Sequence, residues 1–281
     1  MPAVVVENLK KSYGDHAAVR GISFEIREGE VFGLLGPNGA GKTTTVEILE
    51  GYRHRDEGSV AVLGADPAHA SHSWRERIGV VLQSSAMYDN LSVREILALF
   101  AGYYDHPRPV DEVISVVGLE EKADARVMRL SGGQKRRLDF GLALVGDPDL
   151  IFLDEPTTGF DPAARRMAWE TIRSLRALGK TILLTTHYLD EAEQLSDRVA
   201  VLREGLIVAT GTPAELTRTP ATEIRYSRDG ETIVVRTEEP TRVLAELASQ
   251  AVVRGEELEG LEVRRPSLED VYLELTTAET P

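Results

Sequence analysis

The feature that most constrains this chain is a glycine-rich loop, GPNGAGKTT, at Gly36–Thr44. A short apolar run, Val31–Leu35, precedes the loop, and residues Thr45–Glu50, which favour a helix, follow it. A strand, a glycine loop and a helix in this order form the setting in which the pattern G-x-x-x-x-G-K-[ST] binds phosphate. The alternative is a chance match in a glycine-bearing loop, which the flanking strand and helix disfavour. We therefore predict a nucleotide site here.

The residue types within the loop suit the phosphates of a nucleotide. Gly36, Gly39 and Gly41 allow the backbone to curl with its N–H groups inward, so that an anion can bind at a helix N-terminus. Lys42 adds a positive charge for the β- and γ-phosphates, and the Thr43 hydroxyl can bind Mg²⁺. The loop therefore predicts a nucleotide that is bound together with Mg²⁺.

The overall charge argues against nucleic acid as a partner. The 281 residues include 46 Asp and Glu against 32 Lys and Arg, which gives a net charge of −14. Residues 219–281 hold 14 acidic residues and 7 arginines, and so contribute −7, half of this charge. An acidic segment of this kind is not attracted to DNA or to an anionic membrane surface.

The apolar content and the N-terminal residues predict a soluble, cytoplasmic chain. Cysteine is absent, so disulfides and Cys-based zinc sites are excluded. The N-terminal residues MPAVVVENLKKSYG lack the layout of a signal peptide, and no apolar run approaches the roughly 18 residues that a membrane span needs. The length allows one large domain or two modest ones.

A second motif, LSGGQ at Leu130–Gln134, opens a predicted helix. Ser131 and Gln134 match a capping box. Gly132 and Gly133 then stand in the first helical turn, although glycine is a poor helix former. This break of a local rule indicates a backbone that a ligand approaches closely, and an anion suits the free N–H groups at a helix N-terminus. The alternative is that SGG is only a loop before a capped helix.

Two carboxylates follow a strand that we expect at the centre of the sheet. Leu150–Leu153 (LIFL) is a continuous apolar run, typical of a parallel strand that is buried on both faces. Asp154 and Glu155 follow it directly, at the sheet edge where open α/β sheets bind ligands. The next buried strand, Thr181–Thr185, leads to His187 at the same edge. The sequence leaves open whether this histidine is structural or contacts the ligand.

The other segments of the first 218 residues follow a β/α pattern that one insert interrupts. Short strands are expected at Ala3–Leu9 and Gly21–Ile26, with Tyr13 exposed in the connection between them. Tyr13 by itself is consistent with an ordinary tyrosine at a strand end. From Leu91 the apolar residues change to helical spacing, so residues 84–146 are predicted to form a helical subdomain.

The character of the chain changes after Thr217, where TRTPATE is typical of a linker. We therefore divide the chain into a first domain, residues 1–218, and a C-terminal accessory region, residues 219–281. This region is predicted to be a small α+β appendage. Its expected elements are strands near Glu223–Tyr226 and Thr232–Thr237 and helices near Thr241–Gln250 and Ser267–Thr276.

Taken together, these motifs resemble those of the ATP-binding subunit of an ABC transporter, over residues 3–217. The occurrence of LSGGQ between Gln83 and the strand that ends in Asp-Glu makes coincidence negligible. The ending, RRPSLEDVYLELT, looks like the C-terminal region of bacterial exporter-type subunits of the drug- and antibiotic-efflux kind. Phe160 stands where Leu is commoner in the family and Gly141 where Ala is common, and neither departure touches a catalytic position. The matching segments are GPNGAGKTT, Gln83, LSGGQ at 130–134, LIFLDEP at 150–156, GFDP at 159–162 and TTH at 185–187.

The resemblance implies an α/β P-loop NTPase fold of the ABC ATPase type. It has a mostly parallel central sheet, antiparallel N-terminal strands, the helical subdomain and the α+β appendage. The implied cofactors are ATP and Mg²⁺, and the implied reaction is ATP hydrolysis. Glu155 would be the general base, His187 would contact the γ-phosphate, and Gln83 would sense the metal and the attacking water. Thr43 and Asp154 would hold Mg²⁺, Asp154 mostly through water.

The resemblance also implies contacts to the nucleotide from two subunits. Tyr13 would stack on the adenine, and Thr44 would face the α-phosphate. Ser131 and Gly133 would bind the γ-phosphate of a nucleotide held by a second subunit, and Asp161 would bridge the interface. The expected assembly is thus a dimer of identical or related ATPase subunits. The implied nucleotide-binding residues are Tyr13, Gly36, Asn38, Gly39, Gly41, Lys42, Thr43, Thr44, Ser131, Gly132, Gly133, Gln134 and Asp161.

A transporter function requires a separate membrane-spanning permease, because the sequence predicts no span in this chain. The resemblance places its docking surface at Ser84–Tyr103 and the protein on the inner face of the cell membrane, and the C-terminal ending favours export. One alternative is an ABC-type ATPase that acts on DNA or the ribosome. DNA-repair relatives insert long coiled coils before the signature, and ribosome-acting relatives usually carry two cassettes, and neither feature occurs here. A regulatory protein that no longer hydrolyses ATP is disfavoured by the presence of Glu155 and His187.

Overall fold

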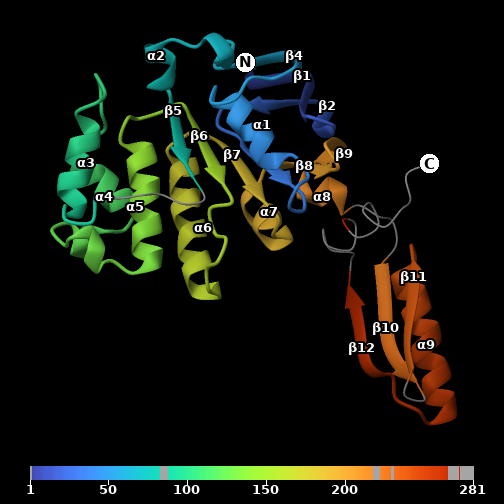
Figure 1. The fold of residues 1–281 in the computed structure, drawn as a ribbon. Helices are drawn as coiled ribbons and strands as arrows, with labels where there is room; N and C mark the ends of the chain where they lie inside the picture. The colour runs from blue at the N-terminus through green and yellow to red at the C-terminus, as the bar shows by residue number, and fades with distance from the viewer. Residues whose placement is uncertain (1, 83–87, 218–221, 229–230, 265–271, 273–281) are drawn as a thin grey trace. The chain divides into compact units, whose positions relative to one another are not determined.

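The computed structural model of the chain describes residues 2–82, 88–217, 222–228, 231–264 and 272 (Figure 1). The chain divides into two compact units, residues 1–210 and residues 211–281. The sequence had suggested a boundary after residue 218, a few residues further along the chain.

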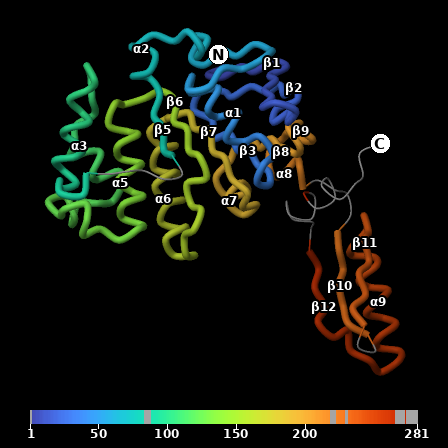
Figure 2. Tube along the Cα trace, viewed as in Figure 1, coloured from blue at the N-terminus to red at the C-terminus, as the bar shows by residue number. Residues whose placement is uncertain are grey.

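A six-stranded sheet runs through the middle of the first unit, in the order β5-β6-β7-β3-β8-β9. β3 pairs in parallel with β7 and β8, and β6 pairs in parallel with β5 and β7. Each parallel pair joins segments that are distant in the chain, as the colours in Figure 2 show. The predicted, mostly parallel central sheet is confirmed. Its strands are β3 (Val31–Leu35), β5 (Ile78–Val81), β6 (Leu150–Asp154), β7 (Thr181–Thr186), β8 (Arg198–Arg203) and β9 (Leu206–Gly211).

A second sheet of three antiparallel strands has the order β2-β1-β4, with β1 at Pro2–Tyr13, β2 at His16–Arg27 and β4 at Glu57–Val62. β1 and β2 extend further than predicted and meet in a tight turn, where Tyr13 pairs with His16. Tyr13 therefore lies at the end of a strand, and its expected place in a longer connection was wrong. The added residues of β1, Lys10–Ser12, are polar, and those of β2, His16–Arg20, mix polar residues with Ala17, Ala18 and Val19 without strict alternation, which hid both extensions from hydrophobic patterning.

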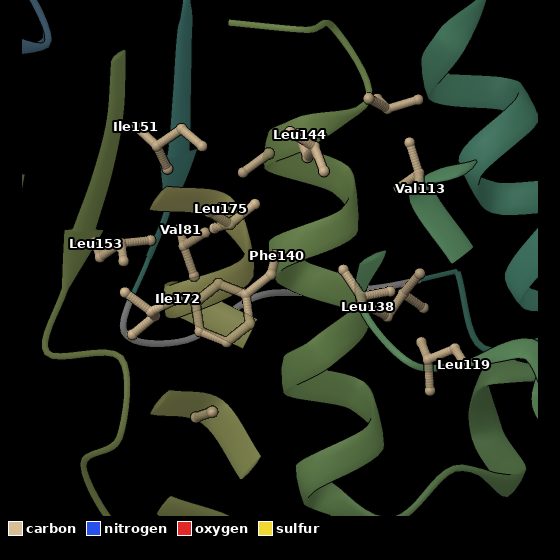
Figure 3. Packing of buried hydrophobic residues seen from close by; sticks show 14 of the residues in the cluster. Val81, Val113, Leu119, Leu138, Phe140, Leu144, Ile151, Leu153, Ile172 and Leu175 are labelled. Atoms are coloured by element: carbon tan, nitrogen blue, oxygen red, sulfur yellow. The ribbon is translucent and has the colours of Figure 1, made fainter. Parts of the chain in front are cut away.

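Each face of the central sheet has its own hydrophobic core. Ile151 and Leu153 of β6 pack with α5 and α6 in one core, whereas Leu150 and Phe152 pack with α1 and the antiparallel sheet in the other. Because successive strand residues point to opposite faces, β6 is buried on both, as the run LIFL predicted. Figure 3 shows Phe140 of α5 within the first core. The three helices are α1 (Lys42–Leu49), α5 (Gly132–Leu144) and α6 (Pro162–Ala177).

The helical part between β5 and β6 contains α3, α4 and α5. The capping box that Ser131 and Gln134 predicted is present at the start of α5. A methyl group at Gly141 would lie 3.3 Å from side-chain atoms of both Leu97 and Val113, so glycine at this position allows α3 and α4 to approach α5 closely. The remaining helices of the first unit are α2 (His72–Arg75), α3 (Val93–Ala101), α4 (Val110–Val116), α7 (Leu189–Leu195) and the short 3-10 helices η1 (Pro67–His69), η2 (Glu120–Lys122) and η3 (Val127–Arg129).

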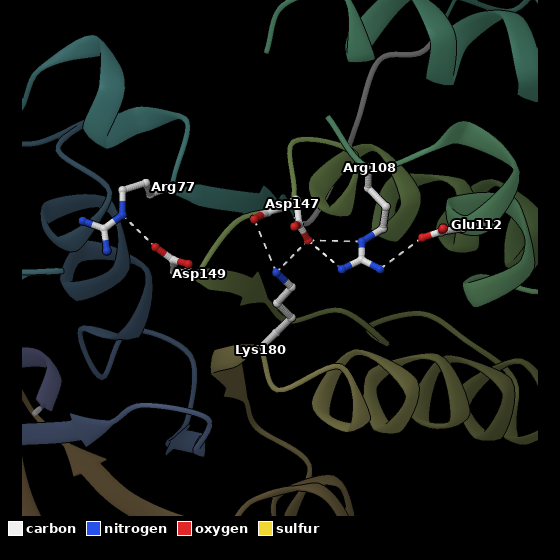
Figure 4. A network of polar contacts seen from close by, with 6 residues as sticks. All are labelled: Arg77, Arg108, Glu112, Asp147, Asp149 and Lys180. Carbon is white, nitrogen blue, oxygen red and sulfur yellow. Dashed lines mark hydrogen bonds and ion pairs between the residues drawn. The ribbon is translucent and has the colours of Figure 1, made fainter. Parts of the chain in front are cut away.

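Charged side chains fasten the loop between α5 and β6 (Figure 4). Asp147 accepts hydrogen bonds from Lys180 at 2.8 Å and from Arg108 at 2.7 Å. Arg77 donates to Asp149 at 2.7 Å. This network holds the amino end of β6, the end opposite to Asp154.

The second unit contains a three-stranded antiparallel sheet in the order β11-β10-β12, together with a helix, α9. Ile224 and Tyr226 of β10 and Ala251 of α9 are buried. β10, β11 and α9 were predicted, but β12 was missed because its sequence, EGLEVR, is mostly charged or exposed. The predicted helix at Ser267–Thr276 lies almost entirely outside the described residues. The elements of this unit are α8 (Pro213–Leu216), β10 (Thr222–Arg228), β11 (Glu231–Thr237), α9 (Pro240–Arg254) and β12 (Glu259–Arg264).

Candidate active site

The glycine loop connects the end of β3 to the start of α1, as predicted. Gly41 is the N-cap of α1 and has a φ of 102°, a left-handed conformation that residues with side chains rarely adopt. A methyl group on Gly41 would lie 2.4 Å from the carbonyl oxygen of Ala18, and one on Gly36 would lie 2.4 Å from that of Leu202. Close backbone contacts from β2 and β8 therefore require both glycines.

Lys42 is buried at the first position of α1. Its Nζ donates to the carbonyl oxygens of Gly36 at 2.8 Å and Pro37 at 3.1 Å, and it lies 3.2 Å from Oε1 of Glu155. An ammonium group has three N–H donors, so these partners match its capacity. The charge of Lys42 is thus compensated by a carboxylate that lies in the same site.

Asp154, at the carboxyl end of β6, is fixed by hydroxyl groups from two other elements. Its Oδ1 accepts from Thr185 of β7 at 2.6 Å, and its Oδ2 accepts from Thr43 of α1 at 3.4 Å. Carboxylate and hydroxyl oxygens are ligands that Mg²⁺ prefers, and Mg²⁺ sites often take only one or two of them from the protein. Thr43 and Asp154 could therefore hold this ion together.

Glu155 has a φ of 44°, in the left-handed region, and its N–H donates to Oγ1 of Thr185 at 2.9 Å. Its Oε2 accepts from the Thr158 hydroxyl at 3.1 Å. Burial raises the pKa of this carboxyl group, but the charge of Lys42 and the Thr158 hydroxyl outweigh burial, with a smaller contribution from His187. The pKa of Glu155 is therefore below its usual value, and the group is a carboxylate that can accept a proton at neutral pH.

His187 follows β7 and lies beside Glu155, with its Nδ1 3.4 Å from Oε2 of the carboxylate. Among the described residues, this buried Nδ1 has no hydrogen-bond partner. The ring packs against Tyr188, with 4.1 Å between the ring centres. The imidazole is thus held in the site beside the Glu155 carboxylate.

Lys42, Thr43, Glu155 and His187 line a cleft of about 560 Å³. The Tyr13 hydroxyl lies 3.5 Å from that of Thr44, and the Arg53 guanidinium lies over the Tyr13 ring, 5.2 Å from its centre. Tyr13 is 40 % exposed, so part of its ring remains accessible. The residues that the sequence predicted and that line the cleft are Tyr13, Asn38, Gly39, Gly41, Lys42, Thr43, Thr44, Glu155 and His187.

Three residues outside the predicted site also line the cleft: His16, Ala18 and Thr158. His16 lies opposite Tyr13 in the turn between β1 and β2, so the strand pairing brings it there. Thr158, three residues after Glu155, could have been found from its position in the loop that follows the carboxylates. His16 and Ala18 carry no motif, since their place depends on the register of two strands.

The LSGGQ residues do not line this cleft. Ser131 caps α5, and neither it nor Gly132, Gly133 or Gln134 is among the described residues of the cleft lining. Gly132 lines a smaller pocket of about 110 Å³ whose lining also includes Glu155 and Thr158, and a methyl group on it would meet no atom within 4 Å. Within one chain, LSGGQ therefore lies near Glu155 but does not share a cleft with the glycine loop.

Two further predicted site residues have different positions. Asp161 is the exposed N-cap of α6 and accepts from the N–H groups of Ala163 and Ala164 at 2.9 and 2.8 Å. It does not contribute to the cleft lining that the structure describes. Gln83 lies outside the described residues.

Comparisons with known proteins agree on one family. A sequence model of the family described as "ABC transporter" matches residues 19–158. The chain is similar to Nod factor export ATP-binding protein I of Burkholderia lata, with 41 % identity over 99 % of this chain and 99 % of that one.

Solved structures of ATP-binding cassettes from this family have a similar fold. One, the ADP conformation of an ATP-binding cassette of an ABC transporter, has a TM-score of 0.68 at 26 % identity and covers 76 % of this chain and 92 % of its own. Another, a dimeric ATP-binding cassette in a post-hydrolysis state with ADP and Pi, has a TM-score of 0.65 at 25 % identity, covering 74 % and 98 %. Among the described helices, none is long and apolar enough to cross a membrane. The chain therefore belongs to the ABC transporter family, as an ATP-binding subunit that hydrolyses ATP.

Proposed function

We propose that this subunit hydrolyses ATP with Glu155 as the general base and thereby drives export through a separate membrane-spanning partner. The observation that carries the proposal is the arrangement around the Glu155 carboxylate. Lys42 Nζ lies 3.2 Å from one of its oxygens, and His187 Nδ1 lies 3.4 Å from the other. A cation for phosphate, a base for water and a second phosphate contact are thus grouped at one place in the cleft.

The glycine loop binds the phosphates of the nucleotide in this proposal. The backbone N–H groups between Gly36 and Thr44 surround the anion, and Asn38 and Gly39 line the same cleft. Lys42 exchanges its contact with Glu155 for the β- and γ-phosphates. Tyr13 stacks on the adenine, with the Arg53 guanidinium supporting its ring.

The Thr43 hydroxyl and the Asp154 carboxylate fit Mg²⁺ as oxygen ligands, and we propose Gln83 as a further contact to the metal and to the attacking water. When bound, the ion supplies positive charge to the phosphates. The contribution of the chain is to hold Asp154 in place, through the 2.6 Å hydrogen bond from Thr185, and to keep the carboxylate beside the phosphate loop.

Glu155 accepts the proton of the attacking water, and His187 contacts the γ-phosphate. The lowered pKa of Glu155 keeps the carboxyl group ionised, and a base must be ionised before the water attacks. The protein otherwise acts by positioning and by charge stabilisation, since phosphoryl transfer requires little covalent work from it.

A complete site takes Ser131, Gly132, Gly133 and Gln134 from a second ATPase subunit, either a copy of this chain or a related one. The free N–H groups at the start of α5 and the open space around Gly132 suit an anion that arrives from outside the chain. Asp161 bridges this interface. A related cassette that was solved as a dimer with ADP and Pi supports the assembly.

We further propose that the protein is peripheral on the inner face of the cell membrane and that residues 211–281 form an accessory region. Full-length relatives are named as export ATP-binding proteins, which supports outward transport. The membrane-spanning partner selects the cargo.

The variant Glu155→Gln tests the proposal. We expect it to bind ATP, to lose about 10² to 10⁴ in turnover, which is the usual contribution of a general base, and to accumulate as a dimer. Phosphate release and size-exclusion chromatography with ATP measure these effects. Glu193→Gln, which changes an exposed carboxylate of α7, is the matched control. Near-normal turnover of Glu155→Gln would exclude Glu155 as the base.

A further inference from the structure

Arg136 is a charged residue that the proposed chemistry does not use, yet it is only 6 % exposed in the second turn of α5. Its Nε donates to the carbonyl oxygen of Pro156 at 2.8 Å, and its Nη1 donates to the carbonyl oxygen of Leu82. Nη1 also lies 3.5 Å from Oδ2 of Asp139. One guanidinium thus connects α5, the end of β5 and the segment after β6.

Packing alone does not account for a guanidinium at this position. Removing a charge from water costs several kcal/mol by general estimates, and a well-packed apolar residue is often as stable or more so. Burial lowers the pKa of Arg136, and the carboxylates of Asp139 and Asp154 act in the opposite direction. The carbonyl contacts are therefore the specific feature that an apolar residue could not reproduce.

The contact with Pro156 lies next to the strained backbone of Glu155. A non-glycine residue with φ near 44° is in an unfavourable backbone conformation, which persists only where its surroundings hold it. The N–H of Glu155 is held by Thr185 at 2.9 Å, and the carbonyl of the next residue is held by Arg136. Hydrogen bonds on both sides of Glu155 thus fix the direction of its side chain.

The second carbonyl group that Arg136 holds is that of Leu82, through Nη1. Leu82 directly precedes Gln83, which the proposed function places at the metal and the water. Arg136 therefore ties the second turn of the LSGGQ helix to the residues that adjoin both the proposed base and the proposed water contact.

We propose that Arg136 is a positioning residue for ATP hydrolysis: its buried guanidinium holds the carbonyl groups of Pro156 and Leu82 and thereby fixes Glu155 in its productive direction. The inference rests on the proposed role of Glu155. Arg136 itself does not contact the nucleotide in this proposal.

The test is steady-state ATP hydrolysis by the full chain carrying Arg136→Met. Misplacement of a catalytic group by about 1 Å can cost about 10²-fold, so we expect kcat to fall about 10- to 100-fold while KM for ATP stays within about threefold. Arg136→Lys, which can reach only one carbonyl at a time, should recover part of kcat.

Two further variants separate positioning from stability. Arg108→Gln removes another guanidinium that anchors the helical part, through Asp147 at the opposite end of β6, and it should lower the melting temperature while kcat is kept (Figure 4). Arg136→Met/Asp139→Asn also removes the carboxylate that pairs with Arg136, and kcat should stay low. Full recovery of kcat in this double variant, or an equal loss in Arg108→Gln, would overturn the proposal.

The outcome can be distinguished from a failure of the proposed function. If Glu155→Gln is inactive and Arg136→Met keeps a normal kcat, only the positioning role is wrong. If Glu155→Gln itself hydrolyses ATP normally, the proposed function fails whatever Arg136→Met does.

Discussion

Lys42 and Glu155 form an ion pair inside the nucleotide cleft, with side chains that are 4 % and 12 % exposed. Each has a second task in the proposed reaction, so the pair must separate when a phosphate enters. The contact keeps both charges compensated in the nucleotide-free protein, where either one alone would be costly to bury. Binding is therefore an exchange of one anion for another at Lys42.

This exchange predicts the effect of Lys42→Ala. The variant should bind ATP at least about tenfold more weakly, because a charge-assisted contact contributes roughly 1.5–3 kcal/mol. Isothermal titration calorimetry measures the affinity, with Lys122→Ala, an exposed lysine outside the cleft lining, as the control. Unchanged ATP affinity would contradict the phosphate contact.

Glu50 provides a second prediction for a single residue. Burial, together with the nearby carboxylates of Asp154 and Glu47, raises the pKa of its carboxyl group from the ordinary value of 4.5 to about 8. Among the described residues, its Oε1 is buried without a hydrogen-bond partner. The folded protein thus keeps a proton that the unfolded chain releases, so this stabilisation is full below pH 4.5 and is lost as pH rises toward 8.

Glu50→Gln should remove this pH dependence. Between about pH 5 and pH 8, we expect the free energy of unfolding of the unchanged protein to fall. In Glu50→Gln this fall should be smaller by about 1–3 kcal/mol. Urea unfolding without nucleotide and with a chelator measures the difference, and Glu193→Gln controls for the loss of any carboxylate. A native protein whose stability rises over this interval would refute the burial of a neutral Glu50.

At this scale, the motif residues were predictable and the buried charges were not. Lys42, Thr43, Asp154 and Glu155 occur in short segments whose local geometry follows from the strand–loop–helix order. Arg136 stands in a polar stretch, KRR, and its burial depends on Leu82 and Pro156, which are distant in the chain. A pattern along the sequence carries no information on such contacts.

Among the elements, α5 combines two opposing demands. Its capping box stabilises the helix N-terminus, whereas Gly132 and Gly133 weaken the first turn. Gly132 is helical and has open space where a methyl group would lie. Stability by itself would thus favour alanine at this position.

Gly132→Ala should therefore stabilise the isolated subunit and impair its activity. We expect about 0.5–1 kcal/mol more stability, from the helix propensity of alanine, and a clear loss of ATP-dependent dimerisation and turnover. Thermal unfolding and phosphate release test the two effects on the same sample. If both stability and turnover increased, the space at Gly132 would have no role in binding an anion from a second subunit.

The elements themselves were predicted to different degrees for physical reasons. The apolar run of β6 and the capping box of α5 depend on nearby residues, and both are confirmed. The full lengths of β1 and β2 and the existence of β12 depend on pairing between segments rich in polar or charged residues, which hydrophobic patterning does not detect.

For the whole molecule, the proposed export function requires a surface for the membrane-spanning partner. The predicted docking segment includes α3, of which Val93, Ile96 and Leu97 are buried in the core. Leu99 and Tyr103 remain 42 % and 65 % exposed on the same segment. The exposed apolar side chains, and not the buried ones, are available to a partner.

Leu99→Asp should separate hydrolysis from coupling. The purified subunit should keep its ATPase activity within about twofold, as expected for a surface change, but should no longer copurify with its membrane partner. Leu178→Asp, at an exposed apolar position after α6, is the matched control. Retained copurification of Leu99→Asp would place the docking surface elsewhere.

The close contacts of the glycine loop also have a consequence for synthesis on the ribosome. Gly36 is packed against the backbone of Leu202, and its N–H donates to the carbonyl of Thr186, although both partners lie more than a hundred residues later in the chain. A nascent chain that has emerged only as far as α1 contains the complete phosphate motif but lacks the strands that shape it. Nucleotide can therefore bind only after almost all of the first unit has left the exit tunnel, and ATP in the cell meets a nearly complete protein.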